Sequence, residues 1–129
     1  MGTIMKISRY RDTSEDGSSF KPVLIEKNEQ ITILPGKSQY VPINMEHNEY
    51  DIRTLQVTNE NNVESTITIF DKKEEGNQLY KSLSEKRTYD ILAIPCQDKD
   101  FTNTAHIYIV NKGSVASVFD ITIKAISLN

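Results

Sequence analysis

Two segments with the same pattern constrain the fold of this 129-residue chain more than any other feature. One is Leu55–Ile69, with the sequence LQVTNENNVESTITI, and the other is Ile107–Ile121, with the sequence IYIVNKGSVASVFDI. In both, apolar and polar residues alternate on either side of a polar cluster that tolerates the left-handed backbone of a tight reversal. Alternation with a period of two is typical of β-strands that bury one face. We therefore predict two strand-turn-strand units and interpret each as a β-hairpin.

The two segments match in kind at a constant spacing of 52 residues, for example at Asn59 and Asn111 and at Ser65 and Ser117. A duplication explains the match, and so does convergent turn chemistry, and the sequence leaves both explanations open. Two copies are too few for a solenoid. The last predicted strand, Val118–Leu128, is the most regular stretch of the chain. Its inward-facing residues are expected to be Phe119, Ile121, Ile123 and Ala125.

Short β-patterned stretches fill most of the remaining chain, at intervals of about 8 to 12 residues. The exception is Lys72–Arg87, where Leu79 and Leu83 have the i, i+4 spacing of a helix. We expect one or two helical turns within Gln78–Lys86, unless Leu79 and Tyr80 belong to a short strand. Eight or nine strands predict an all-β domain with little or no helix, built as a two-sheet antiparallel β-sandwich. Jelly-roll-like and immunoglobulin-like connectivities both fit this pattern.

Prolines and polar residues set the expected strand boundaries. Proline cannot donate a hydrogen bond to the ladder. Pro22 therefore predicts a position at a sheet edge or out of the ladder, and Pro42 predicts an edge strand or an irregular strand. Pro95 is expected to end the strand Thr88–Ile94. A polar turn over residues 28–30 is expected to separate two short strands.

A chain of this length is expected to form one domain, which buries roughly two thirds of its unfolded surface. Residues 1–19 combine a β-compatible stretch with a polar loop, and we expect an N-terminal arm there. Residues 20–129 are expected to form a single β-sandwich domain. With one cysteine, Cys96, the chain has no intramolecular disulfide.

Charge and hydropathy narrow the classes of partner. The formal net charge is −3 and acidic residues interrupt the basic ones, so we expect no nucleic-acid partner. The N-terminus lacks the apolar stretch of a signal peptide, and no run approaches the roughly 20 apolar residues of a membrane span. We therefore expect the protein to be synthesised in the cytoplasm and to have no membrane partner. Its expected final location is the cytoplasm or a virion or surface assembly.

An acidic loop offers the one candidate metal site. Asp98, Asp100 and Asn103 supply oxygen ligands at closely spaced positions, which is the chemistry that calcium uses. The loop lacks the glycine and the distal glutamate of an EF-hand, and acidic loops are commonly solvated turns, which is the interpretation we favour. We expect no cofactor, with calcium as the alternative.

No catalytic constellation is visible in the sequence, and we expect the protein not to be an enzyme. His47 and His106 are the two histidines, and alternation places His106 on the same strand face as Tyr108, as a histidine of the sheet surface or an interface. Cys96 follows a proline and is expected to be a small buried or half-buried residue rather than a nucleophile.

Tyrosine side chains are the remaining resource for binding, since a phenol ring can anchor a protein interface or stack on a sugar. We single out Tyr40, Tyr50 and Tyr108 as candidate interaction residues. The leading hypothesis is a non-enzymatic structural or interaction module that forms homo-oligomers or joins a larger assembly. One example is an accessory, decoration or fibre-type protein of a phage particle. The alternative is a carbohydrate-binding β-sandwich module, with or without calcium.

Overall fold

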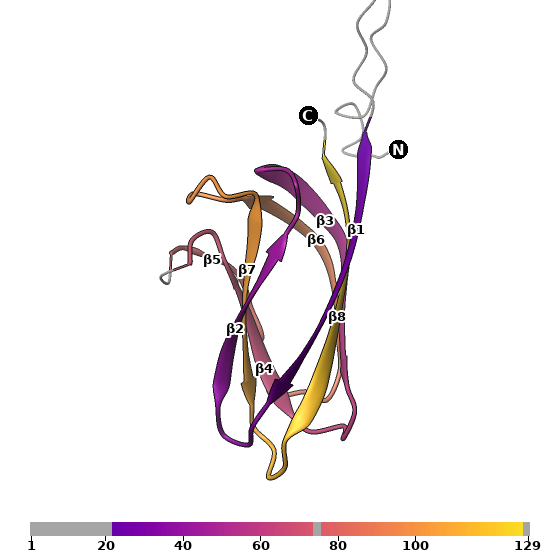
Figure 1. The fold of residues 1–129 in the computed structure, drawn as a ribbon, viewed down its shortest axis with the longest axis vertical. Helices are drawn as coiled ribbons and strands as arrows, with labels where there is room; N and C mark the ends of the chain where they lie inside the picture. The colour runs from indigo at the N-terminus through magenta and orange to yellow at the C-terminus, as the bar shows by residue number, and fades with distance from the viewer. Residues whose placement is uncertain (1–21, 74–75, 128–129) are drawn as a thin grey trace, which may run out of the picture.

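The structure is a computed structural model that describes residues 22–73 and 76–127, so the expected arm of residues 1–19 lies outside the described residues. The described residues form eight strands and no helix, arranged as two antiparallel four-stranded sheets that pack face to face (Figure 1). The predicted two-sheet β-sandwich is confirmed. No helix in this part of the chain is long and apolar enough to cross a membrane.

The connectivity is that of a jelly roll. One sheet has the order β1-β8-β3-β6 and the other β2-β7-β4-β5. The first strand pairs with the last, the second with the seventh, the third with the sixth and the fourth with the fifth. A two-stranded ribbon rolled over itself gives this arrangement. The strands are β1 (Val23–Ile33), β2 (Ser38–Asn44), β3 (Glu49–Asn59), β4 (Ser65–Phe70), β5 (Gln78–Lys81), β6 (Tyr89–Gln97), β7 (Thr104–Asn111) and β8 (Ser117–Ser127).

The interpretation of the two similar segments as hairpins was wrong. β3 and β4 belong to different sheets, and so do β7 and β8, so each segment crosses from one sheet to the other. The segments instead pair with each other, with Val57 opposite Ile121 and Ile67 opposite Ile109. Each connection has five residues, 60–64 and 112–116, and roughly 3.3 Å per residue is enough to span the distance of about 10 Å between packed sheets.

Equivalent asparagines close both crossings. The Nδ2 group of Asn59 donates to the Val63 carbonyl at 3.1 Å, and the Nδ2 group of Asn111 donates to the Val115 carbonyl at 2.9 Å. Asn111 is fully buried and also donates to the Ile33 carbonyl. The match at these two positions therefore reflects the same side-chain bridge across four residues.

The core lies between the two sheets and comes from the inward-facing residues of the strands. Its largest fully buried side chains include Phe119, Leu55 and Ile107, and burial of each such side chain contributes about 2 kcal/mol to stability. Tyr89 of β6 also connects the sheets, because its hydroxyl donates to the Ser65 carbonyl of β4 at 2.6 Å. The inner faces predicted for the last strand are confirmed.

Two predicted strand boundaries were wrong. β1 continues through residues 28–30, because Asn28 and Gln30 point to the outer face and donate to Asp120 of β8. β6 continues past Pro95 to Gln97. β6 is an edge strand, which is where proline is tolerated within a strand.

Expectations about two edge strands, the segment Gln78–Lys86 and Cys96 agree with the structure. β1 and β2 are edge strands, as Pro22 and Pro42 predicted. Within Gln78–Lys86 the short strand β5 forms instead of a helix, which was the stated alternative. Cys96 is buried and is a free cysteine.

Candidate functional site

The outer face of the sheet β2-β7-β4-β5 gathers aromatic side chains from three strands. In the strand register, Tyr40 of β2 lies opposite Tyr108 of β7, and His106 of β7 lies opposite Phe70 of β4. Tyr40, Phe70 and Tyr108 are half-buried, so part of each ring faces solvent. We call the surface formed by these three rings the aromatic face.

The rings of the aromatic face hold one another in place. The Tyr40 and Tyr108 centroids are 5.2 Å apart, and Phe70 meets Tyr108 edge to face at 5.4 Å. The Lys73 Nζ atom lies 5.7 Å from the centroid of the Tyr40 ring. Tilted and edge-to-face pairs, like cation-π contacts, are favourable arrangements. The three rings therefore form a fixed surface rather than separate mobile side chains.

A buried hydrogen-bonded chain supports this surface from below. The Nε2 atom of His106 lies 2.7 Å from an Asp98 carboxylate oxygen, and its Nδ1 atom lies 2.8 Å from the Tyr40 hydroxyl. A carboxylate can only accept, so the hydrogen bond to Asp98 assigns the ring proton to Nε2. In the neutral ring Nδ1 then accepts the hydrogen bond that the Tyr40 hydroxyl donates. The chain from Asp98 through His106 fixes the position of the Tyr40 ring.

The Asp98 carboxylate accepts five hydrogen bonds from its own loop and from β7. The donors are the backbone amides of Asp100, Thr102 and Thr104, the Thr102 hydroxyl and the His106 ring, at 2.7 to 2.9 Å. Burial by itself raises the pKa of Asp98, which is 2% exposed, but these hydrogen bonds outweigh burial and hold the pKa well below its usual range. The side chain is therefore an ionised anchor for the loop over residues 98–104.

The loop carries all three candidate metal ligands. Ligand atoms of Asp98, Asp100 and His106 lie within 4.8 Å of one another. Asn103 is exposed, and its backbone carbonyl accepts a hydrogen bond from the backbone amide of Met45 at 2.7 Å. Because protein donors engage both oxygens of Asp98, a cation at this position would compete with them. His106 is no calcium ligand, because calcium takes oxygen donors and both ring nitrogens of His106 have protein partners. Calcium binding stays a prediction.

The structure brings Tyr40 and Tyr108 together but does not bring Tyr50 to them. Tyr50 lies on the inner face of β3, is 5% exposed, and has a pKa raised above its ordinary value, chiefly by burial. The signal was present in the sequence, because Tyr50 precedes Ile52 by two residues and therefore shares its face. Phe70 was not singled out from the sequence, although it follows Thr68 by two residues and therefore shares its strand face.

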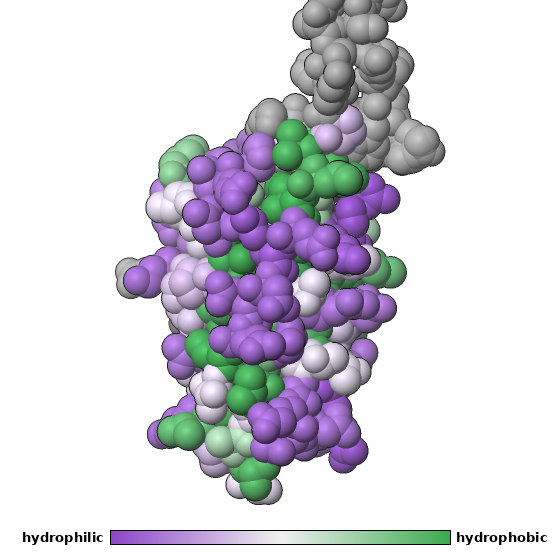
Figure 2. All heavy atoms as spheres, turned by 45° about the vertical axis from the view of Figure 1, so that its right-hand side comes forward, coloured by the Kyte–Doolittle hydropathy of each residue, from purple (hydrophilic) through white to green (hydrophobic). Residues whose placement is uncertain are grey.

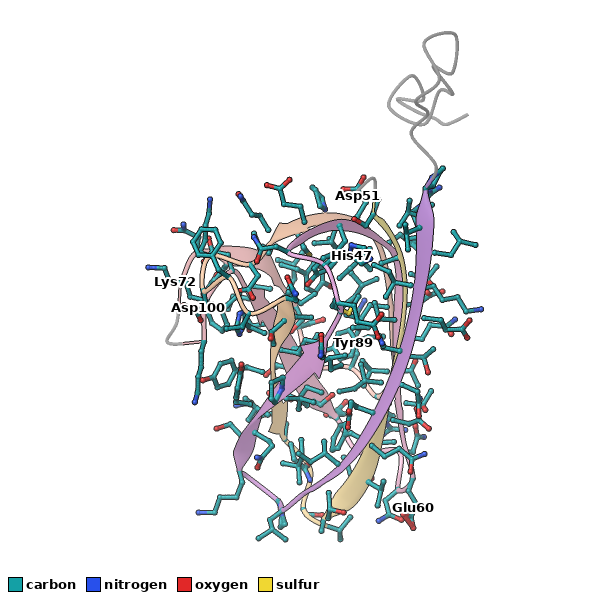
Figure 3. All side chains as sticks on the ribbon, turned by 45° about the horizontal axis from the view of Figure 1, so that its top comes forward. His47, Asp51, Glu60, Lys72, Tyr89 and Asp100 are labelled. Atoms are coloured by element: carbon teal, nitrogen blue, oxygen red, sulfur yellow. The ribbon has the colours of Figure 1, made fainter. Side chains whose placement is uncertain are left out.

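The two histidines occupy different environments. His106 lies on the strand face that alternation predicted, but it is 2% exposed, so its assignment to the sheet surface was wrong. The loop of Asp98 and the Tyr40 ring cover it. His47 is half-buried in the loop between β2 and β3, and Figure 3 shows it apart from Asp100. Among the described residues, the Asp98-His106-Tyr40 chain does not include His47.

Cys96 is not activated for chemistry. Burial raises the pKa of its thiol to about 12, so the thiol stays protonated at neutral pH.

No protein-family model matches the chain, and no curated protein matches it either. Function is therefore inferred from the residues of the aromatic face and from what supports them.

Proposed function

We propose that the protein is a non-enzymatic interaction module that joins a larger protein assembly through the aromatic face. The kind of assembly we have in mind is a phage particle or a similar surface assembly, with this chain as an accessory, decoration or fibre-type subunit. The observation that carries the proposal is the fixed cluster of three half-exposed rings, Tyr40, Phe70 and Tyr108. Tyrosine and phenylalanine are enriched at protein interfaces, and prearranged rings lose little conformational entropy on binding.

The supporting chain argues for positioning rather than catalysis. Asp98, His106 and Tyr40 stand in the order of a carboxylate, a base and a hydroxyl, which is the order that activates a nucleophile. An adjacent base activates a hydroxyl by taking its proton, and a lowered pKa at that hydroxyl makes the proton easier to take. The pKa of Tyr40 is instead raised, first by burial and then by Tyr108, Asp100 and Asp98. The raised pKa and the hydrogen bond to His106 favour a hydroxyl that holds the ring in place.

The jelly-roll frame is compatible with this proposal without deciding it. Viral capsid proteins and lectins both use jelly rolls, and a fold alone does not establish a function. What favours an interaction surface is the contrast with the opposite sheet. Its outer face has a row of polar side chains that bond to one another and exposes Leu24 and Leu92 as separate apolar residues rather than as a ring cluster.

Carbohydrate is the second candidate ligand, and one observation favours it. The Lys73 ammonium group lies over the Tyr40 ring, and the Asp100 carboxylate accepts a hydrogen bond from the Lys73 amide at 2.8 Å. Charged groups beside stacking rings are the combination that positions a sugar ring and its hydroxyls. This second proposal uses the same face as the first.

Site-specific photo-crosslinking tests the first proposal. A benzoylphenylalanine at Thr68, which lies opposite Tyr108 on the aromatic face, is compared with one at Gln56, which lies opposite Thr122 on the outer face of the other sheet. In particles or lysates of the source organism, we expect a defined protein adduct at Thr68 and none at Gln56. Equal adducts at both positions, or adducts at Gln56 alone, would contradict the proposal.

A glycan array and calorimetry separate the two candidates. Binding of a glycan that is lost in Tyr108→Ala and kept in Gln56→Ala would favour the carbohydrate candidate. Absence of binding to every glycan, together with a protein adduct at Thr68, would leave the assembly role as the better proposal. A calcium arm in the same titration tests the acidic loop.

A further inference from the structure

The free edge of β1 is a second surface that can bind a partner. β1 pairs with β8 over eleven positions, and within the described residues no strand pairs with its other edge. It is the longest of the four edge strands, with eleven residues against seven in β2, four in β5 and nine in β6. An unpaired strand edge presents N–H and C=O groups that can bond to another strand.

The side chains of β1 form a symmetric pattern about Asn28. On the strand face that points toward the core, the order is Ile25, Lys27, Glu29, Ile31. One basic and one acidic residue therefore stand at equal distances from Asn28, and one isoleucine flanks each of them. Such a pattern is complementary to itself when a second copy runs in the opposite direction.

We propose that β1 pairs antiparallel with β1 of a second copy of this chain, with Asn28 opposite Asn28 of the partner subunit. In this register Lys27 lies opposite Glu29 of the partner subunit, and Ile25 lies opposite Ile31 of the partner subunit. The two-fold axis repeats both pairings, so two ion pairs and two apolar pairs form. The sheet β1-β8-β3-β6 of one copy and the same sheet of the second copy then form one continuous sheet of eight strands.

Neighbouring registers lose this complementarity. A two-fold axis through Lys27 places Lys27 opposite its own copy and Ile25 opposite Glu29. An axis through Glu29 places two carboxylates opposite each other and Lys27 opposite Ile31. Like charges directly opposite one another are destabilising, and a charge opposite an isoleucine gains nothing. The side-chain pattern of β1 therefore selects the register centred on Asn28.

Lys27 and Glu29 also have a second explanation, which the experiments below test against the first. Inward-pointing charges on an edge strand can protect that edge from pairing. Lys27 already contacts its own chain, since its Nζ atom lies 2.5 Å from the Glu46 carboxylate. If protection is the only role, the chain does not pair through this edge. The surface is separate from the aromatic face, so the inference does not rest on the proposed function.

Cysteine cross-linking tests the register directly. Asn28 and Gln30 are both exposed and both donate to Asp120, so they are matched positions. In the proposed register the two copies of residue 28 are adjacent, whereas the two copies of residue 30 lie about 14 Å apart along the strand. A disulfide spans at most about 7 Å between Cα atoms. Under mild oxidation we expect a disulfide-linked dimer from Asn28→Cys and none from Gln30→Cys or the unmodified chain.

Sedimentation equilibrium tests the charge pairs. The mass of the 14.7 kDa chain is expected to rise toward twice this value with concentration, because one strand edge buries little area and gives a reversible dimer. Glu29→Lys places lysines opposite each other twice and is expected to raise the dimer dissociation constant about tenfold. The triple reversal K27E/E29K/E46K keeps every pair and is expected to restore dimerisation.

Three results would overturn the inference. One is a monomer at every concentration, with no cross-link at position 28, which supports the edge-protecting role. Another is a dimer whose dissociation constant Glu29→Lys leaves unchanged. The third is cross-linking that is as efficient at position 30 as at position 28. None of these results bears on the photo-crosslinking at Thr68, so failure here is distinguishable from failure of the proposed function.

Discussion

The outer faces of the two sheets are built by the same alternation but present different chemistry. On the sheet β1-β8-β3-β6, Asn28 and Gln30 donate to the Asp120 carboxylate at 2.6 and 2.9 Å. On the sheet β2-β7-β4-β5, the Asp98 carboxylate lies buried and fixes aromatic rings through His106. Figure 2, which turns the β1 and β8 side of Figure 1 forward, shows many hydrophilic side chains there and a hydrophobic patch near its upper end.

The difference between these faces shows how a sheet surface becomes available for binding. Polar side chains that bond to one another on an exposed face exchange readily with water and leave little unsatisfied surface for a partner. Rings held from below keep their apolar area exposed in one arrangement. Each face is organised around an aspartate. Asp120 lies among polar side chains on the solvated face, and Asp98 is buried under a loop beneath the aromatic face.

Substitution of the two aspartates should give the largest difference between the faces. Asp98→Asn keeps the shape but turns an amide group toward backbone donors and removes a buried charge, so we expect the free energy of unfolding to fall by about 3 kcal/mol. Asp120→Asn, on the half-exposed face, is the matched control and should cost less than about 1 kcal/mol. Urea unfolding followed by circular dichroism measures both. Equal losses would show that the two faces are supported alike.

Acid should reveal the same asymmetry with a smaller effect. The pKa of Asp98 is lowered in the folded protein, so its contribution to stability is present above the unfolded value of about 3.9 and is lost as pH falls below it. Each proton taken up on unfolding contributes a slope of up to about 1.4 kcal/mol per pH unit. We expect the slope below pH 4 to decrease in Asp98→Asn and to stay unchanged in Asp120→Asn. An unchanged slope in Asp98→Asn would show that other carboxylates cause the acid sensitivity.

Two tyrosine hydroxyls test how the aromatic face is held. Tyr40→Phe leaves the buried Nδ1 atom of His106 without its donor, and we expect a loss of about 1.5 kcal/mol. Tyr108→Phe removes a longer, exposed hydrogen bond to the Lys73 carbonyl, at 3.2 Å, and should cost about 0.5 kcal/mol or less. Thermal and urea unfolding of the two variants, measured side by side, give the comparison. A larger loss in Tyr108→Phe would contradict the role assigned to His106.

Alternation in the sequence was enough to predict which residues face the core. The inner row of the last strand was predicted from its period of two, and Phe119, Ile121 and Ile123 are fully buried. What alternation cannot give is the partner of a strand. The segment around Asn59 has the local pattern of a hairpin, yet its two strands enter different sheets, because five connecting residues permit either path.

The candidate site was predictable in part for a related reason. Asp98 and Asp100 stand out as oxygen donors in one loop, and Tyr40 and Tyr108 as rings on strands. Their relation depends on the pairing of β2 with β7, which places Tyr40 beside His106 across 66 residues of chain. Burial of His106 also depends on a loop that folds back over its strand. Neither event leaves a local signal in the sequence.

The smallest predicted effect concerns the polar face itself. Gln30→Ala removes one exposed hydrogen bond to Asp120, and water can replace the donor, so we expect a loss of about 0.5 kcal/mol or less. Tyr40→Phe deletes a single hydroxyl and is the comparison on the other face. If Gln30→Ala costs as much as Tyr40→Phe in the same urea titration, the polar row is as organised as the aromatic face. The contrast between a solvated and an organised surface would then have to rest on exposed ring area alone.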